Sequence, residues 1–185
     1  MNAYVALLRG VNVSGKNKIK MAEFRSLLEE KLGFNHVETY IQSGNILFQA
    51  NRGNESDIAG SISEVIKKSY GYDVPVWVYS HKEFTNIYTS NNFISASGYE
   101  TAFLHTTLFH DTLPANTLEL LEPYAVQEEE LNVGVKCIYL YAPNGYGKTK
   151  LSNTHMEKKL GTRATTRNWK TMTKLKEMMD ELALK

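Results

Sequence analysis

Two stretches of this sequence have the spacing of phosphate-binding loops. Residues 142–149 (Ala-Pro-Asn-Gly-Tyr-Gly-Lys-Thr) fit the relaxed form, between a predicted strand and a predicted helix. Residues 10–16 fit the stricter form until Asn17 replaces the Ser or Thr hydroxyl that would hold Mg²⁺. A nucleotide hydrolase of this type also needs a parallel sheet and a later strand that ends in an acid, and nothing after Thr149 predicts that strand. We therefore interpret both spacings as false positives for hydrolysis, which leaves phosphate contact without hydrolysis open.

Side chains that suit an anion follow the first predicted strand and fill a later turn. The loop from Gly10 to Lys18 is polar, and the turn from Gln42 to Asn45 joins two alternating runs. We expect both to meet at one sheet edge, where glycines let backbone N–H groups approach a ligand. Turn dihedrals and solubility explain part of the same set without any ligand. The predicted anion-binding residues are Arg9, Asn12, Lys16, Asn17, Lys18, Gln42, Ser43, Asn45, Arg167 and Asn168, with Ser14 offering a further hydroxyl in the loop.

Arg167 is the single most informative of these residues. We predict that Arg167 and Asn168 lie in the first turn of the last helix, behind Thr165 or Thr166 as its cap. A cation in the first turn opposes the helix dipole. Arg167 there is mildly unfavourable unless it pairs with a carboxylate or a bound anion, and this misfit is what singles the residue out.

The formal net charge of +1 conceals an uneven distribution. Residues 1–50 carry six Lys or Arg and four Asp or Glu, whereas residues 51–100 carry four and six. Residues 101–140 carry one and six, and residues 141–185 carry ten and four. Two basic ends therefore flank an acidic middle, which favours an anionic partner, although basic side chains can also merely solvate helix faces.

The elements that must position these residues follow from hydrophobic spacing. Residues 1–80 predict the order strand, helix, strand, strand, helix, strand, which is the split βαβ or ferredoxin-like pattern. Gly33 stops the first helix, Asn54 or Ser56 caps the second, and Pro75 places the fourth strand at a sheet edge. The predicted strands span 3–8, 36–41, 46–50 and 74–79, and the predicted helices span 21–32 and 58–69.

The second half predicts a variant of the same unit. Strands are expected over 101–109, 128–133 and 136–141, and a helix over 149–160, whereas the fourth strand looks weak or lost near 163–166. The last helix has an apolar stripe that begins at Trp169, which we interpret as a core anchor. The fold class is therefore α+β, with two ferredoxin-like subdomains of mainly antiparallel sheets and helices on one face. Its predicted parts are a ferredoxin-like subdomain over 1–80, a linker with a short helix over 81–100, and a second ferredoxin-like variant with an extra C-terminal helix over 101–185.

Composition excludes several classes of protein. The chain has 185 residues with 42% hydrophobic and 22% charged side chains, which argues against disorder and coiled coils. No apolar run approaches the roughly 18 residues of a membrane span, and we detect no signal peptide. The single Cys137 forms no internal disulfide, which fits a reducing, cytoplasmic location. The five histidines are scattered and no Cys-x-x-Cys occurs, so we predict no metal site and no cofactor.

Several segments together resemble a known family. They are Leu7 to Val13 with Gly15 to Lys18 and Met21, Tyr40 to Asn45, Gly147 to Leu151, and Thr166 to Thr171 with Lys174 and Leu175. In that order they are similar to the bacterial family named domain of unknown function 1697, over essentially the whole chain. The resemblance implies a cytoplasmic α/β protein with ferredoxin-like halves and no established activity. It also implies that the predicted anion-binding residues, Lys18 excepted, match the polar signatures of the family.

Three functions remain open from the sequence. The best-supported hypothesis is a module that binds a phosphate-bearing ligand, a nucleotide or nucleic acid, without catalysis. The second is an enzyme that acts on a small anionic substrate through Lys16, Asn17 and Arg167, against which the missing general base argues. The third is a protein-interaction scaffold whose acidic middle pairs with the basic end of another molecule.

Overall fold

The computed structural model describes residues 1–13, 15–51 and 53–185, so Ser14 lies outside the described residues. The described chain divides into two compact units. Unit 1 comprises Met1–Thr85 and Leu175–Lys185, and unit 2 comprises Asn86–Lys174. The end of the last helix, expected in the second subdomain, is thus part of unit 1. Within the described residues, no helix is both long and apolar enough to cross a membrane.

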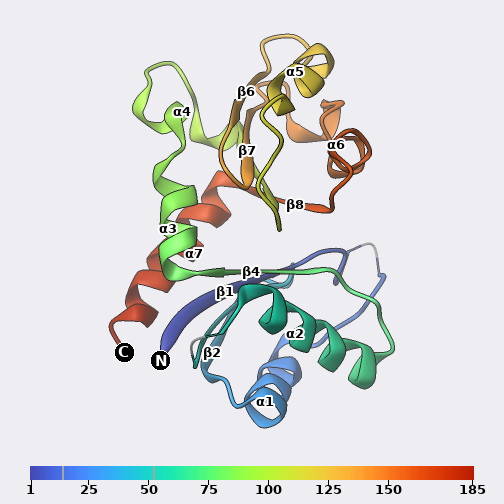
Figure 1. Cartoon of the computed structure of the whole chain (residues 1–185), viewed down its shortest axis with the longest axis vertical. Coiled ribbons are helices and arrows are strands. Elements are labelled where there is room, and N and C mark those ends of the chain that lie inside the picture. The colour runs from blue at the N-terminus through green and yellow to red at the C-terminus, as the bar shows by residue number, and fades with distance from the viewer. Residues whose placement is uncertain (14, 52) are drawn as a thin grey trace. The chain divides into compact units, whose positions relative to one another are not determined.

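Unit 1 has the predicted ferredoxin-like sheet. Its strands lie in the order β2-β3-β1-β4, and each pairs antiparallel with its neighbours. Pro75 immediately precedes β4, and β4 is an edge strand, as predicted. Figure 1 shows α1 and α2 side by side on one face of this sheet. The bounds are β1 Asn2–Leu8, α1 Met21–Leu32, β2 Asn35–Tyr40, β3 Asn45–Ala50, α2 Glu55–Tyr70, β4 Val76–Ser80 and α3 His81–Thr89, whose last residues belong to unit 2.

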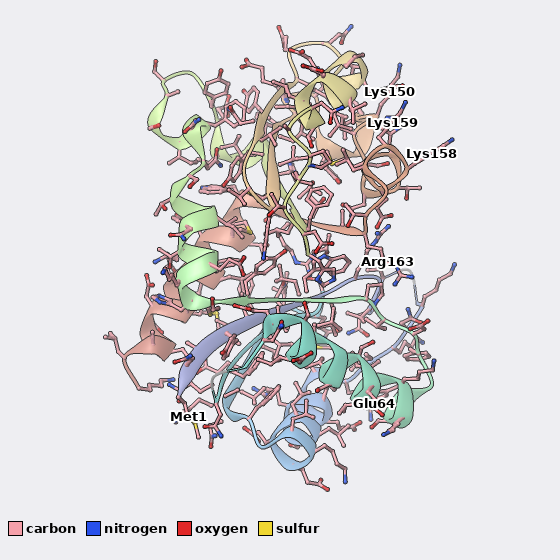
Figure 2. The ribbon with its side chains drawn as sticks, in the orientation of Figure 1. Met1, Glu64, Lys150, Lys158, Lys159 and Arg163 are labelled. Carbon is pink, nitrogen blue, oxygen red and sulfur yellow. The ribbon has the colours of Figure 1, made fainter. Side chains whose placement is uncertain are left out.

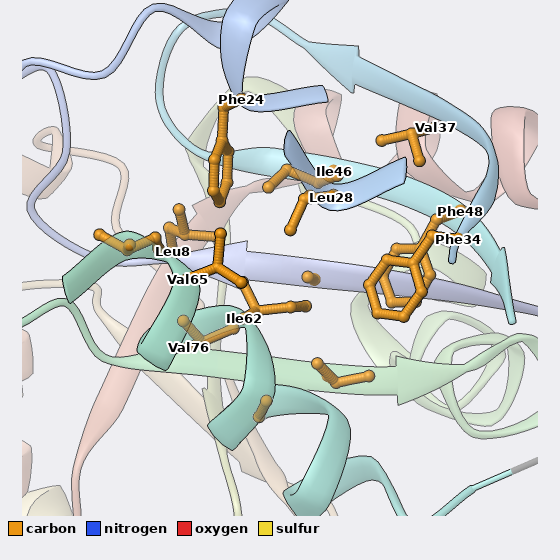
Figure 3. Close-up of a cluster of buried hydrophobic side chains, with 14 of the residues drawn as sticks. Leu8, Phe24, Leu28, Phe34, Val37, Ile46, Phe48, Ile62, Val65 and Val76 are labelled. Atoms are coloured by element: carbon orange, nitrogen blue, oxygen red, sulfur yellow. The ribbon is translucent and has the colours of Figure 1, made fainter. Parts of the chain in front are cut away.

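The core of unit 1 forms where α1 and α2 cover the sheet. Phe24 and Leu28 of α1 and Ile62 of α2 are fully buried against Ile46 and Phe48 of β3, as Figure 3 shows. The rings of Phe34 and Phe48 stack with centroids 4.2 Å apart. Two predicted helix signals are confirmed, because Gly33 adopts the left-handed conformation after α1 and the Asn54 side chain accepts a hydrogen bond from Ser56 N before α2. With Asn54 as the cap, α2 begins at Glu55, three residues before the predicted span.

Unit 2 repeats the sheet arrangement of unit 1. Its order, β6-β7-β5-β8, is again antiparallel and has the same topology as the first sheet. The expected loss of the fourth strand is wrong, because β8 pairs with β5 from Ala164 to Asn168. The two threonines of β8 are β-branched and favour a strand, but they do not form the alternating apolar pattern by which a strand is predicted. The bounds are α4 Asn92–Ser95, η1 Thr101–Phe103, β5 Leu104–Phe109, α5 Thr117–Leu121, η2 Glu122–Tyr124, β6 Glu130–Val133, β7 Cys137–Tyr141, η3 Tyr146–Lys148, α6 Asn153–Leu160, β8 Ala164–Asn168 and α7 Trp169–Ala183.

The final turns of α7 are held to the rest of unit 1 by polar contacts. Gln49 Nε2 of β3 donates a hydrogen bond to Leu182 O at 2.9 Å. Asp180 Oδ1 lies 2.7 Å from His81 Nε2 at the start of α3, and Lys176 Nζ donates to both carboxylate oxygens of Asp180. The hydrogen bonds from Lys176 and then from His81 lower the pKa of the Asp180 carboxyl below its ordinary value of 3.8.

This lowered pKa makes the stabilising effect of Asp180 depend on pH. A carboxyl whose pKa is lower in the folded state stabilises the fold at neutral pH and loses that effect as pH falls below about 4 and through its folded pKa. Asp180→Asn therefore lowers the free energy of unfolding at pH 7, by less than about 1 kcal/mol because Asp180 is half exposed and screened. Urea titrations of both proteins at pH 7 and pH 3 measure the difference. If Asp180→Asn lowers the free energy of unfolding as much at pH 3 as at pH 7, the ionised carboxylate of Asp180 is not the stabilising group.

Candidate functional site

The loop after β1 and the turn between β2 and β3 converge, as predicted. Leu8 N donates to Gly44 O at 2.7 Å, and Asn12 Nδ2 donates to Gln42 O at 2.9 Å. β1 and β3 are neighbours in the sheet, with Leu7 opposite Asn45. The loop that follows β1 and the turn that precedes β3 therefore lie at the same end of these two strands. The ferredoxin-like topology thus brings together two segments that lie far apart in the sequence.

A cavity of about 550 Å³ lies between the loop, the turn and the start of α1. Three predicted residues line it, namely Asn12, Lys18 and Gln42. Its other walls come from residues not predicted to bind a ligand, which are Gly15, Ile19, Lys20, Met21 and Ala22. The signal that could have found them is their position, because they connect the glycine-containing loop directly to the first turn of a helix.

The asparagines at this site hold the backbone rather than point to a ligand. Asn12 donates to Ile19 O and accepts from Ile19 N, each at 2.9 Å, and Asn17 Nδ2 donates to Gly10 O. Asn12 and Asn17 both have positive φ, which Asn tolerates better than most residues. The Asn45 side chain is fully buried and donates to Tyr40 O and to the Ser43 hydroxyl. These side chains therefore fit the turn-forming explanation and shape the cavity from behind.

The lysines differ from the asparagines because their charge faces solvent. Lys16 and Lys18 are exposed, and neither forms an ion pair with any described residue. Lys20 pairs with Glu23 at 2.9 Å, and the hydrogen bond from that pair raises the pKa of Lys20. Arg9 is half-buried at the end of β1, where its backbone N donates to Pro75 O. Lys18 therefore offers an accessible unpaired cation at the cavity, and Lys16 adds an exposed cation in the same loop.

The start of α1 adds partial positive charge to the same cavity. Lys20 is the N-cap residue in an extended conformation, and in the described structure no side chain accepts a hydrogen bond from the first turn. The first backbone N–H groups of an α-helix have no partner inside the helix and favour an anion. Met21 and Ala22, the first two residues of α1, line the cavity. An anion there could meet backbone N–H groups and the Lys18 ammonium together.

The predicted placement of Arg167 and Asn168 in a helical turn is wrong. Both belong to β8 in unit 2, and α7 begins only at Trp169. Arg167 is buried, and its Nη1 donates to Thr165 Oγ1 at 2.9 Å and to Thr166 O at 3.0 Å. Asn168 Oδ1 accepts from Thr171 N and so caps α7. Arg167 therefore precedes α7 and does not belong to its first turn, because the register with β5 continues the strand to Asn168.

The phosphate-loop spacing at residues 142–149 also has a structural explanation. Thr149 Oγ1 donates to Glu129 Oε2 and accepts from Leu151 N, so this hydroxyl supports the loop before α6. Figure 2 shows Lys150, Lys158 and Lys159 on the same side of unit 2, around α6. Lys159 is not a simple surface cation, because its Nζ lies 4.3 Å from the centre of the Tyr124 ring and donates to the Tyr124 hydroxyl. Basic residues of the C-terminal segment thus gather locally in unit 2.

Groups for other chemistry are buried or dispersed. Cys137 lies in β7 and is buried, and burial raises the pKa of its thiol to about 11. The thiol is therefore protonated at neutral pH. Among the described residues, no group of three or more His, Cys, Asp or Glu side chains is placed to hold a metal ion.

Comparisons with known proteins agree with this architecture. The model of a family described as "Protein of unknown function (DUF1697)" matches residues 1–139. The solved structure of the conserved bacterial protein SP0830 from Streptococcus pneumoniae is similar, with a TM-score of 0.75 and 25% sequence identity. The match covers 96% of this chain and 98% of that chain. No curated protein matches this chain significantly.

Proposed function

The chain belongs to the family of unknown function DUF1697, and we propose that it binds a phosphate-bearing ligand, a nucleotide or a nucleic acid, without catalysis at that site. The ligand would occupy the cavity between the loop after β1, the Gln42 turn and the start of α1. No His, Asp or Glu is among the described residues that line this cavity, so it offers no ordinary general base.

The observation that carries this proposal is the coincidence of three features at one cavity. The uncapped start of α1 supplies backbone N–H groups, Lys18 supplies a formal charge, and Asn12 with Gln42 supplies polar walls. The apolar side chains of Ile19 and Met21 beside them suit a ligand that carries more than a bare phosphate. Arg167 and Asn168 belong to unit 2, so their part in ligand binding stays a prediction.

Binding is measured by isothermal titration with inorganic phosphate, ATP and a short single-stranded DNA, in wild type and in Lys16→Ala/Lys18→Ala. We expect ATP or the DNA to bind, and the double variant to bind it about tenfold more weakly or worse, since about 1.4 kcal/mol corresponds to a factor of ten. A steep dependence of affinity on salt assigns the site to nucleic acid, because many phosphate contacts release many counterions.

The matched control is Lys67→Ala/Lys68→Ala on α2, which removes the same two charges from exposed positions outside the cavity. Its affinity should stay within about twofold of wild type, because screening limits the effect of distant charges. If none of the three probes binds, or if both double variants lose affinity equally, no site of this kind exists at the cavity.

A further inference from the structure

A second cavity, of about 640 Å³, lies in unit 1 at the opposite end of β1 from the first. Figure 1 shows the start of β1 near the start of α3 and the end of α7, and Figure 2 labels Met1 there. Its walls come from the start of β1, the start of α2, the junction of β4 with α3, and the end of α7, and most of the wall is polar. The side chains of Tyr4, Glu55, His81 and Lys82 are among its lining residues.

His81 is held at this cavity by a carboxylate on α7. Its Nε2 lies 2.7 Å from Asp180 Oδ1, and the Lys176 ammonium donates to Asp180 at 2.7 Å and 2.6 Å. These bonds keep Asp180 ionised at neutral pH, so it accepts a hydrogen bond from Nε2–H. The carboxylate thereby selects the imidazole tautomer whose Nδ1 carries the free lone pair. No described residue is hydrogen-bonded to Nδ1, and a histidine oriented in this way is suited to accept a proton.

The remaining polar walls add charge and hydroxyl groups. Lys82 follows His81 in α3, is exposed, and pairs with no carboxylate among the described residues. Tyr4 contributes a hydroxyl that accepts a weak hydrogen bond from Gly53 N at 3.4 Å. Glu55 at the start of α2 is the one acidic side chain among the described lining residues. The cavity therefore combines a proton acceptor with a cation that can stabilise a developing oxyanion.

We propose that this cavity is a hydrolytic site for small carboxylic esters, with His81 as the general base and Asp180 as its positioning residue. His81 Nδ1 removes a proton from a water molecule while the water oxygen bonds to the ester carbonyl carbon. The carbonyl oxygen becomes an oxyanion near the Lys82 ammonium. When the tetrahedral intermediate collapses, the ester C–O bond breaks, and the imidazolium returns the proton to the departing alkoxide. The products are a carboxylic acid and an alcohol, and neither an oxidant nor a reductant is consumed.

The test is hydrolysis of p-nitrophenyl acetate by the full chain. We expect saturable hydrolysis in wild type and at least a tenfold lower kcat/KM in His81→Gln, since a positioned base contributes about a hundredfold or more to natural reactions. The matched control is His36→Gln, which removes an exposed histidine outside the cavity and leaves the rate unchanged. Circular dichroism establishes that each variant is folded.

A second measurement separates positioning by Asp180 from a purely structural role. In ¹⁵N spectra of the imidazoles, wild type should show the Nε2–H tautomer at His81, Asp180→Asn a mixture, and Asp180→Glu a return toward wild type in both tautomer and rate. Hydrolysis that does not saturate, or that His36→Gln lowers as much as His81→Gln, overturns the proposal. So does a wild-type imidazole protonated on Nδ1.

Discussion

Gly44→Ala should lower the free energy of unfolding by about 3 kcal/mol. A Cβ at Gly44 would lie 2.6 Å from Leu8 Cβ and 2.7 Å from Val11 Cγ2. Leu8 and Val11 are both buried, so neither can move aside without disturbing the core. Gly44 also has a φ of +78°, which L-amino acids other than glycine adopt at a cost. Urea denaturation measures the loss.

Gly10→Ala is the matched control for this substitution. Gly10 has a similar φ of +73°, but a Cβ there would have no heavy atom within 4 Å. Its cost should be only about 1 kcal/mol, the conformational part of the Gly44 effect. The difference between the two variants therefore measures the close approach of the Gln42 turn to the end of β1. Equal losses would show that the turn and the strand are not in contact as described.

Asn12→Ala should lower the free energy of unfolding by about 2 kcal/mol and open the proposed ligand cavity. The Asn12 side chain makes three hydrogen bonds of 2.9 Å, two with Ile19 and one with Gln42 O. Alanine leaves these backbone groups without their partner and releases the loop from the turn. We therefore expect the variant to bind the ligand of the wild-type protein at least about tenfold more weakly, a loss of about 1.4 kcal/mol.

Asn17→Ala provides the comparison, because Asn17 is also an asparagine with positive φ in the same loop. Its side chain makes one hydrogen bond, to Gly10 O at 3.0 Å, so the expected loss is about 1 kcal/mol. Chemical denaturation of both variants, together with ATP titration, separates the cost of the backbone conformation from the cost of the lost hydrogen bonds. A smaller loss for Asn12→Ala than for Asn17→Ala would contradict the assigned role of Asn12.

The first sheet was predictable because its signals are local. Alternating and continuous apolar runs mark β1 to β4, and residues such as Gly33 and Asn54 act on their own helix ends. The strand β8 was not predictable in the same way. Its sequence, Ala-Thr-Thr-Arg-Asn, contains few apolar residues, and pairing with β5 decides its conformation. The wrong placement of Arg167 in a helix follows from this. Because the strand was missed, the last helix was predicted to begin before Trp169, its observed first residue.

The position of the site in the fold was predictable from the sequence, but the contacts of its side chains were not. The ferredoxin-like topology brings the loop after β1 beside the Gln42 turn, and the sequence identified both segments. It did not distinguish Asn12 and Asn45, whose amides hold the backbone, from Lys18, whose ammonium remains accessible. Composition identifies polar groups, whereas their hydrogen-bond partners depend on distances that only the folded chain defines.

The sequence by itself therefore determined the α+β class, the antiparallel order of the first sheet, and the segments that meet at its edge. Periodicity, turn residues and helix caps suffice for this, because each acts over a few neighbouring residues. Only the tertiary structure decided that β8 completes the second sheet and that the end of α7 belongs to unit 1. It also decided that His81 meets Asp180, 99 positions away, at a cavity. Such contacts join residues that are remote in sequence, and no local pattern encodes a partner at that distance.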